Sequence, residues 1–292
     1  MYKAKQAAFE QTLRRFCGGA LYKFPPKLRE SMEYSLIGTG GKRLRPLMFL
    51  ECYNMFKGAL CQSIRDAACA IECIHISSLV HDDLPCMDDD AERRGIPSAH
   101  VKFGEAVALL SGDALLNLAY ETLFDAVCDS NFDKQVAQGC RVIAKAAGGG
   151  GMLGGQIVDI LLQKSDASPE SMGREAEYIY NNKTGALFAA AVKAGAVMAG
   201  VGGGDLESIT EFGRDFGFAF QLLDDYNEIK EAGSGKIDPS VSPYFAYKGL
   251  DAGVLELTNL TAGISARLAD IGKRFDISFF SELTAMFKLK QH

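Results

Sequence analysis

The chain has 292 residues, and its 31 Lys and Arg stand against 37 Asp and Glu, which gives a formal net charge of −6 at pH 7. This acidic balance argues against a protein that mainly binds DNA or RNA, because phosphate backbones require clustered positive charge. Apolar residues make up 48% and charged residues 23% of the chain, so the composition excludes disordered and fibrous proteins. Small phosphorylated ligands stay possible, since they need only a few local cations.

Apolar residues recur at three- and four-residue spacing along most of the chain, and strand alternation is scarce. The predicted helices cover residues 5–21, 27–37, 43–57, 63–83, 105–129, 133–147, 150–163, 172–199, 205–230 and 243–272. Ser168 followed by Pro169 is typical of a helix start. No stretch resembles an interdomain linker. We therefore predict one all-α domain over residues 1–292, a bundle of about ten helices.

The first residues, Met1 to Phe16, are amphipathic and lack the apolar run of a secretory signal. The most apolar stretch, Ala186 to Val201, contains Lys193 and is rich in Ala and Gly, which favours a buried helix over a membrane span. All eight cysteines lie in the first half without a Cys-x-x-Cys pair, which predicts apolar filler in a reducing compartment rather than a redox site. We expect a cytoplasmic protein with no stable membrane insertion.

The most informative segment is residues 81–90, where five aspartates fall within nine residues at the end of an apolar helix. Such like charges repel one another unless cations gather there. Mg²⁺ fits best, since one or two carboxylates usually hold it while substrate phosphates supply further ligands. An exposed acidic loop is the alternative, but the apolar run from Ile71 to Val80 disfavours it. An EF-hand is disfavoured because Leu84 and Cys86 stand where oxygen ligands would be required.

Helix geometry constrains this segment further. On a regular helix Asp82 and Asp88 would point about 240° apart and could not share a metal ion. Pro85 breaks the helical hydrogen-bond ladder, so the chain can bulge and return Asp88 toward Asp82. His75, seven residues before Asp82, lies about 20° from it around the helix and faces the same cavity.

A second acidic site lies at residues 220–228, inside another apolar helix. Asp224 and Glu228 are four residues apart, so both carboxylates lie on one face. Alone, the pair Asp224-Asp225 is equally typical of a helix surface. Together with the first acidic segment, it predicts a metal site between helices of a bundle.

Cationic residues follow the pattern that anionic ligands require. Lys42 and Arg45 follow the turn Gly40-Gly41, Arg93-Arg94 directly follow the acidic segment, and Lys183-Thr184 interrupt a helix. Arginine suits the recognition of phosphate oxygens. Any single one of these would be typical of a solvated surface. In combination with the carboxylates, they predict a site for Mg²⁺ and two diphosphates.

The chain resembles the trans-isoprenyl (polyprenyl) diphosphate synthases, the family of farnesyl and geranylgeranyl diphosphate synthases. The matching motifs, in the family's order, are G-G-K-R-L-R-P at 40–46, I-H-x-x-S-L-V-H-D-D-L-P-C-M-D-D-D at 74–90, R-R-G at 93–95, H-V-K-F-G-E-A at 100–106, G-D-A-L-L at 112–116, G-G-Q-x-x-D at 154–159, K-T-G at 183–185 and G-F-A-F-Q-L-L-D-D at 217–225. The insert between Asp83 and Asp88 is similar to that of the bacterial farnesyl and plant geranylgeranyl branches.

The resemblance implies the isoprenoid synthase fold, with helices around a deep central cavity, and a homodimer. It implies two or three Mg²⁺ ions, bound with the substrate diphosphate by Asp82, Asp83, Asp88, Asp224 and Glu228. It implies further that the allylic diphosphate is bound with help from Arg93, Lys183, Thr184 and Gln221. Isopentenyl diphosphate would be bound by Lys42, Arg45, His75 and Arg94.

The resemblance implies a short-chain trans-prenyltransferase that condenses isopentenyl diphosphate head-to-tail with allylic diphosphates, and these residue types agree with that reaction. Loss of diphosphate leaves an allylic cation, so metal ions and arginines stabilise the departing charge while an apolar cavity excludes water. Two positions depart from the family pattern. Glu228 replaces the usual Asp, and the stretch from Gly235 to Pro243 is shortened, so that Lys236 is the only cation left there.

Two alternatives belong to other functional classes. The shortened stretch would also suit a weakly active or inactive subunit that binds prenyl diphosphates and regulates a partner synthase. A terpene cyclase would use the same metal ions but would not need the second diphosphate site.

The resemblance implies that product length depends on the residues four and five positions before Asp82. The resemblance implies that they line the cavity floor, where an aromatic side chain stops farnesyl formers at fifteen carbons. Here they are Ser78 and Ser77, which predicts geranylgeranyl diphosphate as a main product, with some farnesyl diphosphate. The competing possibility is a floor closed by bulky side chains of a neighbouring helix, namely Leu115, Leu116 or Tyr120.

Overall fold

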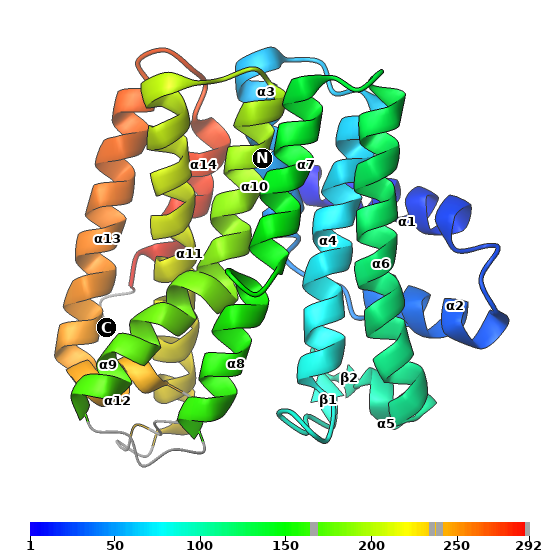
Figure 1. Cartoon of the computed structure of the whole chain (residues 1–292). Helices are drawn as coiled ribbons and strands as arrows, with labels where there is room; N and C mark the ends of the chain where they lie inside the picture. Colours follow the sequence, from blue (N-terminus) through cyan, green and yellow to red (C-terminus); the bar gives the residue numbers. More distant parts are fainter. Residues whose placement is uncertain (164–168, 234–236, 238–241, 290–292) are drawn as a thin grey trace. The chain divides into compact units, whose positions relative to one another are not determined.

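The computed structural model describes residues 1–163, 169–233, 237 and 242–289, which fold into two compact units. Residues 1–50 and 59–140 form the first unit. Its elements are α1 (Tyr2–Ala20), α2 (Pro26–Glu33), the π-helical turn η1 (Tyr34–Gly38), the first half of α3 (Leu44–Lys57), α4 (Gln62–Asp82), β1 (Glu92–Arg93), β2 (Ile96–Pro97), α5 (Ala99–Phe103), α6 (Glu105–Asp129) and the first half of α7 (Lys134–Ala147) (Figure 1).

The second unit consists of residues 51–58 and the described part of residues 141–292. Besides the ends of α3 and α7, it contains α8 (Met152–Gln163), α9 (Pro169–Ile179), the π-helical turn η2 (Tyr180–Thr184), α10 (Gly185–Met198), α11 (Gly203–Ala232), α12 (Pro243–Lys248), α13 (Leu250–Ile271), α14 (Ser278–Thr284) and the 3₁₀ turn η3 (Ala285–Phe287).

The all-α fold class is confirmed. Among the described residues the only strands are β1 and β2, two antiparallel residues each, with Arg93 opposite Ile96. None of the described helices is both long and apolar enough to cross a membrane. The prediction of one domain over residues 1–292 stays a prediction.

The helices differ from the expected ones where long segments are interrupted and where short helices were not expected. The segment 172–199 is interrupted by η2, and the segment 243–272 is divided at Gly249, whose φ of +84° ends α12. Two short helices, α5 and α14, were not expected, because five to seven residues are too few for a clear periodicity. α9 begins at Pro169 as predicted, whereas Ser168 lies outside the described residues.

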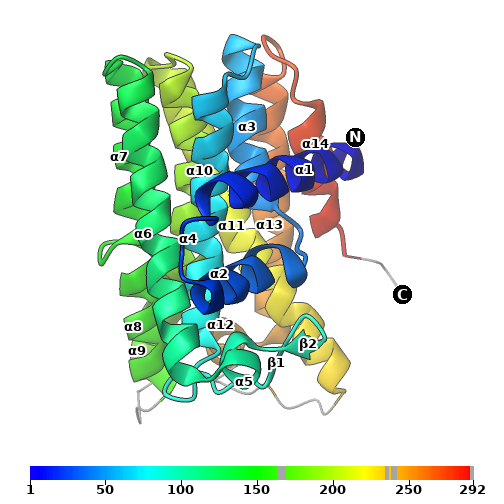
Figure 2. The same ribbon diagram turned by 90° about the vertical axis from the view of Figure 1, so that its right-hand side faces the viewer.

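α4 is the central helix of the first unit. It packs against α6, α1 and η1, and its buried residues lie on almost every side. Small side chains such as Ala67, Ala70 and Cys73 are fully buried and let these neighbours approach closely. Figure 2 shows α1 lying across α4. The end of α4 is therefore fixed by packing on several sides.

An aromatic core lies in the second unit. Phe212 and Phe216 of α11 contact Phe188 and Phe280, with ring centroids 5.3–5.9 Å apart. α11 also approaches α10 closely, because a Cβ atom on Gly217 would lie only 2.7 Å from Gly185 Cα. This contact holds α11, which carries the second acidic motif, against η2.

The cysteines are only partly the apolar filler that the sequence predicts. Five are buried and three are exposed, and none forms a disulfide. The prediction is wrong for the exposed Cys61, Cys86 and Cys128, which lie at or beyond helix ends, where polar surroundings need no apolar side chain.

Candidate active site

The first acidic segment begins where α4 ends, at Asp82. Asp83 caps the helix, and Pro85 follows in a turn. The backbone N–H of Asp88 donates a hydrogen bond to the carbonyl of Asp82, at 2.9 Å. This contact confirms that the chain bulges and returns Asp88 to the helix end. That the two carboxylates share a metal ion stays a prediction.

Asp83 is held by Arg93 within this segment. Its side chain is almost fully buried, and its Oδ1 accepts hydrogen bonds from Nε of Arg93, at 2.8 Å, and from Nη2. Nη2 also donates to Asp90 Oδ2 at 2.8 Å. Burial raises the pKa of Asp83, and the bonds from Arg93 oppose that rise. Arg93 thus joins two of the five aspartates.

A tight hairpin positions the two arginines that follow the acidic segment. Arg94 and Gly95 have φ of +56° and +79°, as the two central residues of a two-residue β-turn require. Arg93 stands on β1 before this turn. The turn therefore separates the arginines, because Arg93 bonds to Asp83 while Arg94 Nη1 donates to the carbonyl of Gly40.

Arg94 thereby joins the loop that precedes α3. A Cβ atom on Gly41 would lie 2.6 Å from Nη1 of Arg94, and the positive φ of +148° also favours glycine there. The positive charges of Arg45 and Arg94 lower the pKa of His75, after burial, which is the larger cause. Three of the four residues predicted to bind isopentenyl diphosphate therefore gather in the first unit, around a neutral imidazole. The fourth, Lys42, lies in the loop that precedes α3, next to Gly41.

Arg43 differs from its cationic neighbours because it points inward. Its guanidinium is buried, and it donates from Nε to Glu10 at 2.7 Å and from Nη1 to Glu72 at 2.6 Å. Nη2 donates to the carbonyl of Leu36 at 2.7 Å. Sequence reasoning assigned Arg43 and its two acidic partners no role, because those partners lie far away along the chain.

The second acidic motif lies on α11. Asp224 is half-buried and Glu228 exposed, on one helical face as predicted. Burial, followed by the negative charge of Asp224, raises the pKa of Glu228. Two such carboxylates one turn apart are suited to a shared cation.

Asp225, beside them, is fully buried in a hydrogen-bonded chain. Tyr180 donates to Oδ2, and Gln221 donates from Nε2 to Oδ1 at 2.7 Å. Thr184 in turn donates to Gln221 Oε1 at 2.7 Å. Burial raises the pKa of Asp225 to about 7. Gln221 and Thr184, predicted as substrate-binding residues, are thus bonded directly to each other, and Asp225 connects Gln221 to Tyr180, which the sequence did not single out.

Lys183 is positioned by α8. Its Nζ pairs with Asp159 Oδ2 at 2.6 Å. A Cβ atom on Gly155 would lie 2.1 Å from the backbone nitrogen of Lys183, so α8 and η2 touch through their backbones. Asp159 was missed as a site residue, although the motif G-G-Q-x-x-D ends on it.

The candidate chain-length residues lie on α4. Ser77 is buried and donates to the carbonyl of Ile74 at 2.8 Å, whereas Ser78 is half-buried and donates to that of His75 at 2.9 Å. On α6, Leu115 is fully buried, and Leu116 and Tyr120 are half-buried.

One motif of α6 serves packing. A Cβ atom on Gly112, the first residue of G-D-A-L-L, would lie 2.1 Å from Nε2 of His81, which stands directly before the acidic pair. The glycine therefore makes room for this imidazole.

The carboxylates of the two acidic motifs suit a cation that binds together with a substrate phosphate. Among the described residues, no three His, Cys, Asp or Glu side chains are arranged to hold a metal ion. The oxygen donors of both acidic motifs match the preference of Mg²⁺, which is usually bound by one or two carboxylates and substrate phosphates. Lys236 lies outside the described residues.

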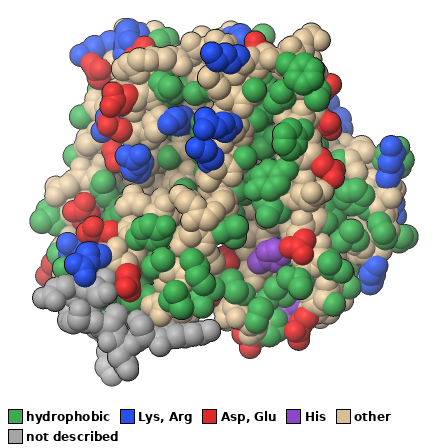
Figure 3. Space-filling model, viewed as in Figure 1, with side chains coloured by type: hydrophobic (Ala, Val, Ile, Leu, Met, Phe, Trp, Pro, Cys, Tyr) green, Lys and Arg blue, Asp and Glu red, His purple; other side chains and the backbone are tan. Residues whose placement is uncertain are grey.

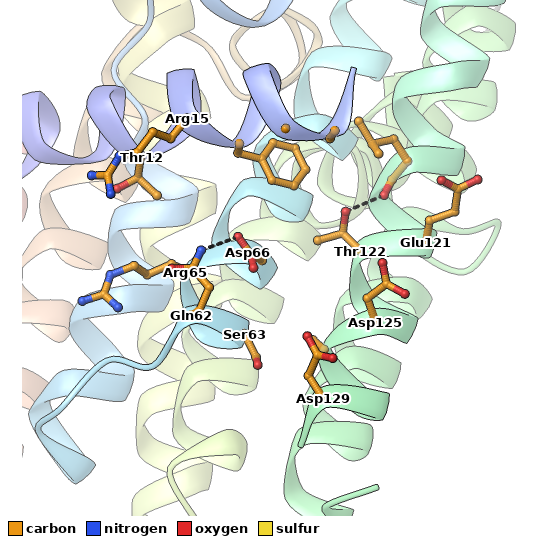
Figure 4. A pocket seen from close by; sticks show the side chains of 15 residues that line it. Thr12, Arg15, Gln62, Ser63, Arg65, Asp66, Glu121, Thr122, Asp125 and Asp129 are labelled. Carbon is orange, nitrogen blue, oxygen red and sulfur yellow. Dashed lines mark hydrogen bonds between the residues drawn. The ribbon is translucent and has the colours of Figure 1, made fainter. Parts of the chain in front are cut away.

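A pocket of about 490 Å³ in the first unit lies away from these groups (Figure 4). It is lined by α1, the start of α4 and the end of α6. Asp66 in its wall is about 24 Å along α4 from Asp82, at 1.5 Å per residue. Its charged side chains are of both signs, namely Arg15, Arg65, Asp66, Glu121, Asp125 and Asp129. This pocket is separate from the candidate active site.

The described residues define an all-helical protein with acidic and cationic groups suited to metal-bound diphosphates. Residues 25–237 match the polyprenyl synthetase family. The farnesyl diphosphate synthase of Escherichia coli is 42% identical over 227 residues, 77% of this chain and 73% of that protein. The chloroplastic large subunit 1 of a heterodimeric geranylgeranyl pyrophosphate synthase of Arabidopsis thaliana is 40% identical, over 71% of this chain and 56% of that protein.

Solved structures agree with this assignment. An FPP/GFPP synthase from Zymomonas mobilis is 30% identical with a TM-score of 0.82, and covers 98% of this chain and 99% of its own. A geranyltransferase from Legionella pneumophila is 27% identical with a TM-score of 0.83, over 98% and 96%. This chain belongs to the polyprenyl synthetase family.

Proposed function

We propose that this chain is a short-chain trans-prenyltransferase. It condenses isopentenyl diphosphate head-to-tail with dimethylallyl, geranyl or farnesyl diphosphate, and gives geranylgeranyl and farnesyl diphosphate plus diphosphate. The observation that carries the proposal is that the first unit contains both an acidic segment and a separate set of cationic residues. The acidic segment with Arg93 suits a metal-bound diphosphate, while the positive charges of Arg45 and Arg94 lie near His75 and suit a second diphosphate.

The chemistry assigns a task to each group. The C1–O bond of the allylic diphosphate breaks, and its electron pair leaves with the diphosphate. The C3–C4 double bond of isopentenyl diphosphate then supplies the electrons of the new C1–C4 bond, and loss of a C2 proton to the departing diphosphate forms the new double bond. Arg93 and Lys183 bind the leaving diphosphate and stabilise its growing charge.

Two or three Mg²⁺ ions would be held by Asp82, Asp83 and Asp88 of the first unit and by Asp224 and Glu228 of the second. When bound, they neutralise the diphosphate and so favour its departure. Arg93 donates to Asp83, so when a cation binds, this arginine must share the carboxylate with it or turn toward the phosphate.

Incubation of the purified chain with both substrates and Mg²⁺ tests the proposal. We expect release of diphosphate and a longer prenyl diphosphate, and no turnover after chelation of the metal. Failure to form product with any of the three allylic primers would refute the proposal. A terpene cyclase would release hydrocarbon from the allylic diphosphate alone.

We propose geranylgeranyl diphosphate as a main product, because neither Ser77 nor Ser78 is large enough to close a cavity floor. Ser77→Tyr should shorten the products to fifteen carbons or fewer. Because Ser77 is buried, the larger side chain will cost about 1–3 kcal/mol of stability, so Ser78→Tyr at the half-buried neighbour is the companion variant. If both variants and the wild type make the same products, the floor lies elsewhere.

We further propose a cytoplasmic homodimer. All eight cysteines are free, as in a reducing compartment. The face in Figure 3 displays hydrophobic side chains over α6, where Leu109, Leu110 and Phe124 are exposed. Exposed large apolar side chains on one helix are consistent with a protein interface there. Light scattering coupled to gel filtration should give twice the mass of the chain, 31.5 kDa.

A further inference from the structure

Three side chains of α1 reach three consecutive residues of the loop before α3. Tyr2 Oη donates to the carbonyl of Lys42 at 2.5 Å, and Gln6 Nε2 donates to that of Gly41 at 2.7 Å. Glu10 accepts from Nε of Arg43 at 2.7 Å. Because Tyr2, Gln6 and Glu10 are spaced four residues apart, they form one stripe along α1.

The loop needs such support, since its backbone is irregular. Gly40, Gly41 and Arg43 have φ of +64°, +148° and +52°. A non-glycine residue at positive φ costs free energy that the surroundings must offset. Arg43 is anchored from beneath by Glu72 of α4 and the carbonyl of Leu36. The carbonyls of residues 41 and 42 are bound from the α1 side.

The direction of these carbonyls has a consequence for anion binding. In a trans peptide the C=O group and the following N–H group point in opposite directions. Since the carbonyls of Gly41 and Lys42 are bound by α1, the N–H groups of Lys42 and Arg43 point away from α1. Successive backbone N–H groups that point the same way are suited to bind an anion.

We propose that Tyr2 and Gln6 are positioning residues for isopentenyl diphosphate. They fix the backbone of residues 41–43 so that its N–H groups and the side chains of Lys42 and Arg45 face the diphosphate. Neither residue touches the reacting atoms. This inference rests on the proposed function, because it concerns the second diphosphate of that reaction.

Steady-state kinetics of Gln6→Ala and Tyr2→Phe test the inference. Each variant should raise the KM for isopentenyl diphosphate about three- to tenfold, the loss expected for one hydrogen bond. The kcat and the KM for the allylic diphosphate should stay within about twofold, because uniform binding of one substrate is weakened. The double variant should multiply the two effects. Gln11→Ala, an exposed glutamine on the same helix, is the matched control and should change nothing.

Each outcome is decisive. A fall in kcat with an unchanged KM for isopentenyl diphosphate, or equal effects in Gln11→Ala, overturns the inference. Glu10 variants are less suitable, because they leave the buried charge of Arg43 without one partner.

The failure of the proposed function is distinguishable from the failure of this inference. If the wild type shows no turnover, calorimetric titration with inorganic diphosphate replaces kinetics. Weaker binding by Gln6→Ala than by Gln11→Ala then supports the positioning role, and equal binding overturns it.

Discussion

The pairs Asp82-Asp83 and Asp224-Asp225 look alike in sequence, but different side chains bind their second aspartates. In each pair the first aspartate is half-buried and the second buried, at 3% exposure for Asp83 and 1% for Asp225. Asp83 is bound by the cationic Arg93, whereas Asp225 is bound by the neutral Tyr180 and Gln221. A buried carboxylate with an arginine stays ionised, while one with neutral partners takes up a proton more readily. The same dipeptide therefore provides a charged pair in one unit and a polar network in the other.

The largest expected effect follows from removing the first aspartate of the first pair. Asp82→Ala should lower turnover at least about 100-fold, the usual loss when charge stabilisation of a transition state is removed. The melting temperature should stay unchanged, because an acidic residue at the C-terminal end of a helix does not favour the helix. Asp125→Ala, at an exposed position of α6, is the control. A chain that melts early would indicate that the aspartates of this segment are structural.

Substitution of each buried aspartate by asparagine should lower the free energy of unfolding by different amounts in the two pairs. Asp83→Asn weakens the bond to Arg93 and should cost about 1–3 kcal/mol in urea unfolding at pH 8. Asp225→Asn should stay within about 1 kcal/mol of the wild type, since its amide can donate to Tyr180 and its oxygen can accept from Gln221. Equal losses in the two variants would contradict the distinction.

The pH dependence of stability should have opposite signs in the two units. Burial and then the charges of Arg45 and Arg94 lower the pKa of His75 below that of the unfolded chain, about 6.5, so the unfolded state binds the proton more readily. This imidazole therefore costs stability as pH falls below about 6.5. Asp225 has a pKa raised to about 7, so its protonated form favours folding at low pH, and that contribution is lost as pH rises toward 7.

Urea unfolding at pH 5, 6, 7 and 8 measures these contributions. His75→Gln should lose less stability than the wild type between pH 7 and pH 5, and Asp225→Asn should lose less between pH 5 and pH 8. In each case the substitution should change the slope of the free energy of unfolding against pH by at most about 1.4 kcal/mol per pH unit. A His75→Gln profile parallel to the wild type would contradict a neutral imidazole.

The smallest effect should appear in thiol labelling of the first acidic segment. Cys86 is exposed between Asp83 and Asp88, whereas the second motif contains no cysteine. In a chain with Cys61→Ser and Cys128→Ser, Cys86 should be the only thiol that reacts rapidly at pH 8. A non-hydrolysable allylic diphosphate analogue with Mg²⁺ should slow its labelling about threefold or more, because bound ligand orders and covers the segment. An unchanged rate would mean that the segment does not meet the ligand.

The features predictable from the sequence are those that local geometry dictates. Pro85 and the spacing of the aspartates were enough to foresee the bulge that returns Asp88 to Asp82, and helical periodicity placed Asp224 and Glu228 on one face. The predicted roles of these residues as metal ligands stay predictions.

Other features depend on partners far away in sequence. Arg43 belongs to the same basic run as Lys42 and Arg45, but it turns inward because Glu72, 29 residues later, meets it beneath the loop. Lys183 likewise depends on Asp159, 24 residues earlier. Composition and spacing do not reveal such pairs, although the acidic end of the G-G-Q-x-x-D motif was a visible signal.

Two glycines of the segment before and within α8 differ in how freely they can vary during evolution. Gly150 has no heavy atom within 4 Å of the position that a Cβ would take, so alanine and small polar residues should appear there in any pool of active variants. Gly155 would place a methyl group against the backbone of Lys183 and push that lysine away from Asp159. A library randomised at both positions and selected for activity should therefore keep glycine at position 155 and accept several residue types at position 150.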